Sequence, residues 1–306
     1  MAPLISYLIT VFNKRADLPN LLQSLRAQSD LDGVEVEFVF ADDLSTDGSL
    51  SFLMDEAKND PRIKVISNSE NKGPAIRINQ AAERALGSFY VPLDADDYLP
   101  SNATRLFLDT IRDTGAPVVF GVSKRGPFPP PKTSGDARVT VANDPLAYCA
   151  RKRIVRMGFM ADRRLWERAN GADERIFIQD QSLPLRLCAN AHRMAYIHDV
   201  VYWLRKPIET NLSSNKSQQH HDRFFSMLYQ LEDQYISPRA KKELFSQLVS
   251  ARWKLAREKY SLAFLSAPFF SYIANRVFSL TPSRKQLAIY ASQMAEVANV
   301  RRILES

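Results

Sequence analysis

Two stretches decide the fold of this chain: Val36-Glu37-Phe38-Val39-Phe40-Ala41-Asp42-Asp43 and Phe89-Tyr90-Val91-Pro92-Leu93-Asp94-Ala95-Asp96-Asp97. Each is a short apolar run that ends in a cluster of aspartates. Such runs are typical of buried strands in a parallel sheet. In an open α/β sheet the ligand crevice lies at the carboxyl ends of the parallel strands. We therefore expect both aspartate clusters at one edge of the sheet, where concentrated negative charge requires a cation or a donor-rich ligand.

Residues 1–215 alternate between strand-like and helix-like segments. Strands are expected at about 4–12, 34–40, 63–66 and 89–93. The intervening segments have apolar residues at helical spacing and begin with typical helix signals, such as Asp17-Leu18-Pro19 and Asn71-Lys72-Gly73-Pro74. This alternation predicts an α/β fold in which helices lie on both faces of a mostly parallel sheet.

After residue 215 the sequence becomes helical. Helices are expected at about 218–234, 238–260, 262–279 and 283–304. The apolar stretch from Ser261 to Leu280 contains Pro268 and Arg276, so we expect an amphipathic or core helix there and no membrane span. The predicted organisation is an α/β domain at residues 1–215 and a basic helical extension at residues 216–306.

The net charge of +7 belongs to the C-terminal part of the chain. Residues 239–306 hold 12 Lys and Arg against 4 Glu and no Asp. Such asymmetry suggests an anionic partner surface, and a membrane is favoured because no motif that reads nucleic acid occurs. A solvated helical face and a homo-oligomer interface are the alternatives.

The cysteines and the N-terminal sequence both indicate where in the cell the protein is expected. Cys149 and Cys188 lack paired or metal-ligand spacing, which indicates a reducing compartment. The first residues lack the pattern of a secretory signal. We expect a cytoplasmic protein, held peripherally at the cytoplasmic face of the inner membrane if the extension binds lipid.

The Asp94-Ala95-Asp96 triplet has the spacing of a metal site. Two carboxylates at a strand end can bind Mg²⁺ together, because this ion binds one or two carboxylates and shares its remaining positions with phosphates. A solvated acidic turn is the alternative interpretation of the same residues.

Together, these motifs resemble the inverting family-2 glycosyltransferases, whose nucleotide-sugar-binding half has the GT-A fold. The first strand ends in Phe12-Asn13, as in that family, and Leu93–Asp97 is similar to its metal-binding Asp-x-Asp motif. Further matches are Ala41–Ser49 to the Asp-Asp-Gly-Ser-Thr-Asp signature, Asn71–Asn79 to the Asn-x-Gly…Ala-Arg-Asn segment, and Gly171–Glu174 followed by Gln179-Asp180 to the acceptor-side elements. The resemblance covers about residues 4–213.

The resemblance implies transfer of a sugar, most commonly from a UDP-sugar, to the hydroxyl of a saccharide or lipid-linked saccharide. It places this hexosyl transfer in lipopolysaccharide or other cell-surface polysaccharide synthesis. It implies Mg²⁺ or Mn²⁺ at Asp96 and Asp94, with Asp97 either as a further ligand or as a group that supports the ligands from behind, and Asp180 as the catalytic base. Asp180 also fits a helix cap. The donor is expected to contact Thr10, Phe12, Asn13, Asp42, Asp43, Lys72, Arg77, Asp94 and Ala95.

Other classes of protein fit the sequence less well. A nucleotidyltransferase requires a glycine-rich phosphate loop after the first strand, where this chain has Val11–Arg15, and no Gly-x-Gly-x-x-Gly of a dinucleotide dehydrogenase occurs. A catalytically inactive scaffold of the same fold, tethered to a membrane by its tail, remains the alternative. It is suggested by Gln179, where relatives commonly have Glu, and by Lys206-Pro207, where many have His.

Overall fold

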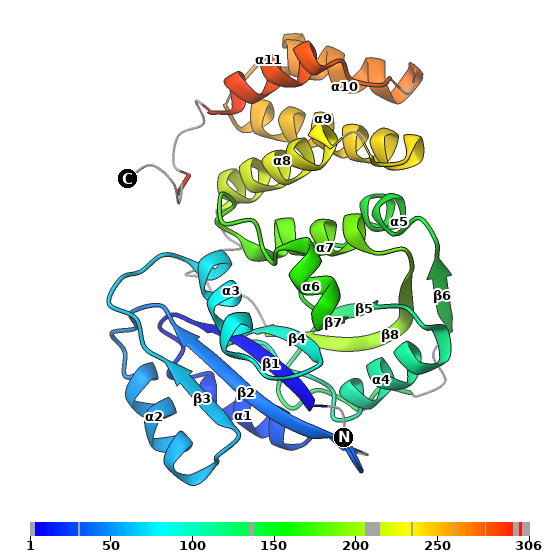
Figure 1. Ribbon diagram of the computed structural model, residues 1–306. Coiled ribbons are helices and arrows are strands. Elements are labelled where there is room, and N and C mark those ends of the chain that lie inside the picture. Colours follow the sequence, from blue (N-terminus) through cyan, green and yellow to red (C-terminus); the bar gives the residue numbers. More distant parts are fainter. Residues whose placement is uncertain are drawn as a thin grey trace.

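A computed structural model describes residues 4–29, 31–134, 138–205, 215–233, 235–259, 261–278, 280–295 and 300–301. Within these residues, one sheet of eight strands has the order β3-β2-β1-β4-β7-β5-β8-β6 (Figure 1). The strands are β1 (Leu4–Val11), β2 (Glu35–Asp42), β3 (Ile63–Ile66), β4 (Phe89–Asp94), β5 (Val118–Arg125), β6 (Val139–Ala142), β7 (Phe159–Asp162) and β8 (Met194–Leu204).

The N-terminal half of the sheet is parallel, as the sequence predicts. β1 pairs with β2 on one side and with β4 on the other, and β2 pairs with β3, all in parallel. Two strands depart from this direction, because β7 runs antiparallel to β4 and β5, and β6 runs antiparallel to β8. The predicted α/β fold with a mostly parallel sheet is confirmed.

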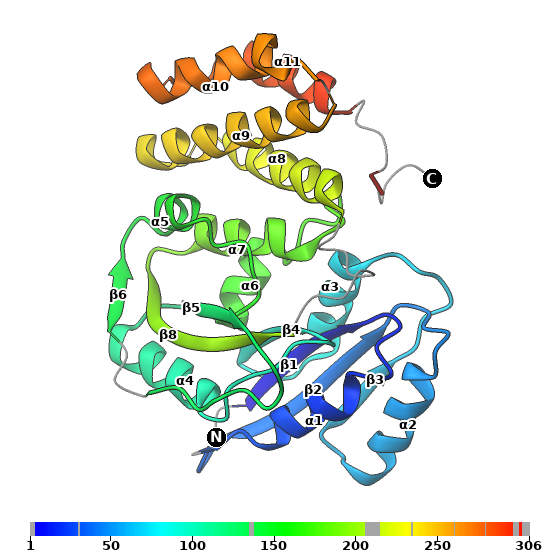
Figure 2. The ribbon, with the colours of Figure 1, turned by 180° about the vertical axis from the view of Figure 1, so that it is seen from behind.

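Helices cover both faces of the sheet, and α1 and α3 lie on opposite faces of its parallel half (Figures 1 and 2). The helices of the α/β part are α1 (Leu18–Arg26), α2 (Ser49–Asn59), α3 (Pro74–Arg84), α4 (Ala103–Thr114), α5 (Pro145–Lys152), α6 (Arg163–Ala169) and α7 (Gln179–Asn190). Both α1 and α3 begin with a proline in the first turn, where the missing N–H is not needed.

The C-terminal helices stack on α5 and α7, away from the parallel half of the sheet (Figures 1 and 2). They are α8 (Lys216–Glu232), α9 (Pro238–Lys259), the short 3₁₀ helix η2 (Ala263–Leu265), α10 (Ala267–Phe278) and α11 (Arg284–Ala295). The helix expected at 262–279 is therefore divided, and α10 starts next to Pro268, which fits only a first turn. Of the helix expected at 283–304, residues 296–299 and 302–304 lie outside the described ranges.

One hydrophobic core runs through both parts of the chain. It includes Leu8 and Phe40 in the sheet, Leu183 in α7, and Phe224 and Leu244 in the C-terminal helices. The start of α8 agrees with the predicted position of the extension, while the division into two domains at residue 215 stays a prediction. No helix in the described ranges has both the length and the apolar character needed to cross a membrane.

Candidate functional site

The carboxyl ends of three parallel strands meet at one edge of the sheet. The register aligns Val11 of β1 with Asp42 of β2, and Thr10 of β1 with Asp94 of β4. The two aspartate clusters therefore lie on either side of the end of β1. This edge is where an open α/β sheet binds its ligands.

Two cationic side chains lie beside the acidic cluster that follows β4. Asp96 Oδ2 is 2.6 Å from Lys14 Nζ and 3.6 Å from Arg205 Nη2. Asp97 is buried and accepts a hydrogen bond of 3.0 Å from the backbone N–H of Arg205. The Asp96 carboxylate thus faces two side-chain cations, whereas the Asp97 carboxylate is bound by a backbone N–H.

Burial and mutual repulsion raise the pKa of two of these carboxyls. Desolvation, followed by the charge of Asp96, raises the pKa of Asp94 to about 6, although Thr10 donates to Asp94 over 3.5 Å. Desolvation and the charges of Asp94 and Asp96 raise the pKa of Asp97 well above its usual range. Ala95, between them, is buried. The cluster therefore holds more negative charge than its surroundings offset.

This donor set fits a divalent cation at Asp94 and Asp96. Carboxylate oxygens suit Mg²⁺ and Mn²⁺, and a bound cation would offset both the desolvation and the repulsion by Asp96 that raise the pKa of Asp94. In the described part of the chain, however, no group of three or more Asp, Glu, His or Cys is placed to hold a metal ion, and Lys14 already binds Asp96. Metal binding by Asp94, Asp96 and Asp97 stays a prediction.

The sequence does not predict Lys14 and Arg205 at this site. Arg205 Nη1 binds Asp17 Oδ1 over 2.6 Å, whereas its Nε and Nη2 atoms make no hydrogen bond to the described residues, and Nη2 is only in ion-pair range of Asp96. A half-buried guanidinium group whose N–H donors are not all used is suited to an anion such as phosphate. Lys14 directly follows the aromatic-Asn pair at the end of β1, which is a usable signal, whereas Arg205 carries no local signal.

Asp180 lies in the first turn of α7, close enough to Asp94 for their charges to interact. Its neighbour Gln179 donates from Nε2 to Asp94 Oδ1 over 2.7 Å, which fixes the start of α7 against the end of β4. Desolvation, followed by the charge of Asp94, raises the pKa of Asp180 to about 7. The N-cap residue is Ile178, so the capping alternative does not describe Asp180. A carboxyl of this pKa is suited to accept a proton near neutral pH.

Asp43 organises the loop before α3. Its Oδ1 accepts from the backbone N–H of Lys72 over 2.8 Å and from Arg77 Nε over 2.7 Å, and its Oδ2 accepts from the N–H of Gly73 over 2.8 Å. Arg77 is buried by this ion pair, while the ammonium group of Lys72 lies 3.0 Å from Glu70. The expected contacts of Asp43, Lys72 and Arg77 with a donor nucleotide stay predictions.

Asp42 has a free acceptor at the strand end. Its Oδ2 accepts from the backbone N–H of Ser45 over 3.0 Å, and its Oδ1 is buried with no hydrogen-bond partner among the described residues. Phe12 is 47% exposed, and Asn13 Oδ1 accepts from the N–H of Thr46 over 2.8 Å. The ends of the neighbouring strands β1 and β2 therefore hold an exposed aromatic ring and a buried, unused acceptor, and these two groups suit the face and the edge of a planar ring.

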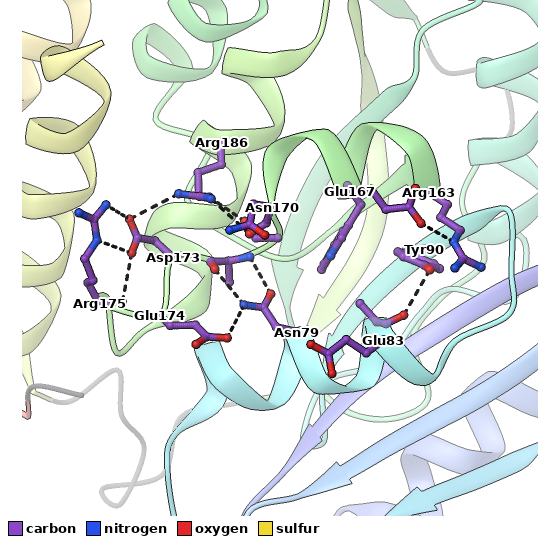
Figure 3. A pocket seen from close by; sticks show the side chains of 14 residues that line it. Asn79, Glu83, Tyr90, Arg163, Glu167, Asn170, Asp173, Glu174, Arg175 and Arg186 are labelled. Atoms are coloured by element: carbon purple, nitrogen blue, oxygen red, sulfur yellow. Dashed lines mark hydrogen bonds and ion pairs between the residues drawn. The ribbon is translucent and has the colours of Figure 1, made fainter. Parts of the chain in front are cut away.

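A cavity of about 640 Å³ lies apart from the acidic cluster, between α3, α6 and residues 170–175 (Figure 3). The predicted acceptor-side segment forms one wall of it, where Asp173 pairs with Arg175 over 2.7 Å. Asn79 of α3 accepts from and donates to the same wall. Tyr90 lines the cavity from near the start of β4, at the opposite end of that strand from the acidic cluster. The polar side chains around the cavity are paired: Asn79 joins α3 to Ala172 and Glu174, and Arg163 pairs with Glu167 within α6. These contacts stabilise the packing of α3 against residues 170–175.

Comparison with protein families identifies the class of this fold and site. Residues 6–153, just under half of the chain, match the family model described as Glycosyl transferase family 2. The predicted resemblance to that family is confirmed over this segment, while inversion stays a prediction. The matched segment contains the aspartates after β2 and β4, while Asp180 and Arg205 lie beyond it.

Individual relatives agree with this assignment. The chain is 37% identical over 95 residues to TuaG of Bacillus subtilis, a putative teichuronic acid biosynthesis glycosyltransferase, which covers 31% of this chain and 36% of that protein. It is similar in structure to TarS 1–349 of S. aureus in complex with UDP-GlcNAc, with a TM-score of 0.68 at 18% identity over 91% of this chain and 81% of that one. The mannosyltransferase PcManGT of Pyrobaculum calidifontis, in complex with GDP-Man and Mn²⁺, gives a TM-score of 0.62 at 18% identity over 96% and 85%. The sequence matches span about a third of the curated relatives' length.

Proposed function

We propose that this protein is an inverting glycosyltransferase, which moves a sugar from a nucleoside-diphosphate sugar to a hydroxyl group of a cell-surface saccharide acceptor. The position of Asp180 supports this most strongly, because a carboxyl with a pKa of about 7 lies beside the acidic cluster that follows β4. A base and a diphosphate site next to each other are what direct displacement by a hydroxyl requires.

The relatives support the class of donor and acceptor. TuaG is named for teichuronic acid synthesis, and the TarS and PcManGT structures hold UDP-GlcNAc and GDP-Man respectively. A UDP-sugar is therefore our first choice of donor and a cell-envelope saccharide our choice of acceptor. The narrower assignment to lipopolysaccharide synthesis and the cytoplasmic location stay predictions.

In the proposed reaction the acceptor oxygen bonds to the anomeric carbon while the bond from that carbon to the diphosphate breaks. The carboxylate of Asp180 takes the hydroxyl proton, and a single displacement inverts the configuration. Lys14 and Arg205 donate to the departing diphosphate, on which negative charge grows. A divalent cation at Asp94 and Asp96 would offset the same charge when bound.

Asp42 and Phe12 are assigned to the nucleobase in this proposal. The unpartnered Oδ1 of Asp42 would accept from a ring N–H, and the exposed ring of Phe12 would stack on the base. A uracil or guanine ring presents an N–H at its edge and fits this acceptor. Cytosine, whose ring nitrogen is an acceptor, fits it less well.

The inactive scaffold remains the alternative function. Gln179, one of the two departures that suggested it, donates to Asp94 and so has a defined place in the site. The other departure, Lys206-Pro207, lies outside the described residues. The two functions differ in whether bound donor turns over.

Calorimetric titration of UDP, GDP, CMP and dTDP, each with and without Mn²⁺, tests the donor site, and Asp96→Ala is the control. We expect metal-dependent binding of one nucleotide that Asp96→Ala weakens strongly. The matching nucleotide sugars are then tested for turnover by the wild type and by Asp180→Asn. This variant should bind the donor with unchanged affinity, and its turnover rate should fall about 10²–10⁴-fold. No nucleotide binding, or binding with no turnover of any acceptor, would favour the scaffold.

A further inference from the structure

Helix α10 presents its apolar side chains to solvent. Phe270, Ile273 and Val277 follow the i, i+3, i+7 spacing of one helix face, and they are 58%, 40% and 66% exposed. Phe278, at the end of the helix, is 72% exposed. On a helix that simply packs onto a core, this stripe would face inward.

The side of α10 that faces the rest of the protein holds both polar and aromatic residues. Asn275 is buried, and Ser271 Oγ accepts a hydrogen bond of 3.0 Å from the hydroxyl of Tyr290 in α11. Phe269 packs its ring 5.0 Å from that of Trp253 in α9. The orientation of α10 is therefore fixed by specific contacts, and its apolar stripe is left without a partner among the described residues.

The exposed stripe belongs to a larger surface, which we call the apolar tail face. Of the sixteen large apolar side chains exposed in the described ranges, nine lie within residues 262–289. The apolar tail face consists of Leu262, Phe264, Leu265, Phe270, Ile273, Val277 and Phe278. It lies on η2 and α10, in the outermost layer of helices (Figures 1 and 2). Concentrated exposed apolar surface of this kind marks an interaction site.

The charge around this face identifies its partner. Between Tyr260 and Ala295 the sequence holds Arg276, Arg284 and Lys285 and no Asp or Glu, and all three basic side chains are exposed. A symmetric contact with a second copy would bring this purely cationic region toward its own image, where like charges repel. Anionic lipid supplies the opposite charge together with an apolar interior.

We propose that the apolar tail face docks this protein on an anionic lipid bilayer. Its aromatic and aliphatic side chains enter the boundary between headgroups and acyl chains, and Arg276, Arg284 and Lys285 contact the lipid phosphates. With 12 residues, α10 is shorter than the roughly 20 that a spanning helix needs, so it lies in the plane of the interface. This inference goes beyond the proposed sugar transfer and does not depend on it.

Vesicle flotation of the full chain tests the proposal. Vesicles of phosphatidylcholine alone are compared with vesicles that also contain phosphatidylglycerol, and binding should be strong only to the second kind. Replacing Ile273, Val277 and Phe278 together with serine should abolish binding. The matched control replaces Met54 and Leu86 with serine, because these apolar side chains are also exposed but lie outside the face.

A second variant separates the charge from the apolar contact. Replacing Arg276, Arg284 and Lys285 together with glutamine should weaken binding to the anionic vesicles on the order of a hundredfold, at about fivefold per charge. Circular dichroism and nucleotide titration show whether the variants are folded. Equal flotation of wild type and both variants would overturn the proposal.

Light scattering without lipid tests the rival occupant. A wild-type dimer that becomes a monomer in the serine variant would assign the face to a second copy and overturn the lipid proposal. Monomers in both cases, together with loss of flotation by the variant, support docking on lipid.

Discussion

Replacing Gln179 with glutamate should destabilise the protein in a strongly pH-dependent way. In the wild type, Gln179 Nε2 donates to Asp94 Oδ1 over 2.7 Å. Glutamate at this position puts a second carboxylate in place of the donor. Two unit charges about 4 Å apart repel by about 4 kcal/mol at an effective dielectric constant of about 20.

The sign of the pH effect follows from the pKa of the new pair. The folded protein raises the carboxyl pKa of this pair above the unfolded value of about 4, so the variant is destabilised once the pH rises past that value. At pH 5 one shared proton restores a hydrogen bond at a cost of about 1 kcal/mol. At about 2 °C per kcal/mol, the variant should unfold roughly 8 °C below wild type at pH 8 and roughly 2 °C below it at pH 5.

Thermal unfolding by circular dichroism at the two pH values measures this difference, with a chelator present to remove divalent cations. Gln179→Leu is the control, because it removes the donor without adding a charge and should lose less stability at pH 8 than the glutamate variant. Equal unfolding temperatures of the two variants at pH 8, or the same loss for glutamate at both pH values, would refute an ionised Asp94 beside residue 179.

Three further predictions follow from other parts of the structure. Initial rates should rise as the pH increases through about 7, because Asp180 must be deprotonated to act as base and its pKa is raised to that value. A rate that does not change from pH 6 to 8 would contradict Asp180 as the catalytic base. Glu37→Gln should lower the free energy of unfolding in urea by about 2–4 kcal/mol with nucleotide affinity unchanged, because the buried carboxylate binds Lys64 and two backbone N–H groups near the amino end of β2, away from the carboxyl strand ends that form the candidate site. Gly73→Ala should destabilise the protein by about 2–4 kcal/mol and weaken nucleotide binding, because a Cβ would lie against the ring of Phe177 and φ is +91°. A nucleotide affinity equal to that of the wild type, measured by calorimetry, would contradict a role of this loop in binding.

The sequence determined the parallel half of the sheet because its signals are local. Each strand is a short apolar run, and β2 and β4 end in aspartates that lie on either side of the end of β1 once the three strands pair in register. The strand β7 was not predicted, because its four residues, Phe159–Asp162, show no period of their own. Its antiparallel direction follows from pairing between β4 and β5.

Only the tertiary structure determined which cations lie at the site and which side of α10 faces the protein. Lys14 reaches Asp96 across 82 residues of chain, and Arg205 arrives there at the end of β8. The place of Lys14 after the aromatic-Asn pair is a local signal, but the contacts of Lys14 and Arg205 with Asp96 depend on which strands become neighbours. The sequence marked residues 261–280 as an amphipathic or core helix, but spacing cannot tell which face packs. The hydrogen bond between Ser271 and Tyr290 of α11 and the burial of Asn275 fix the inward side of α10, which leaves the apolar stripe outward.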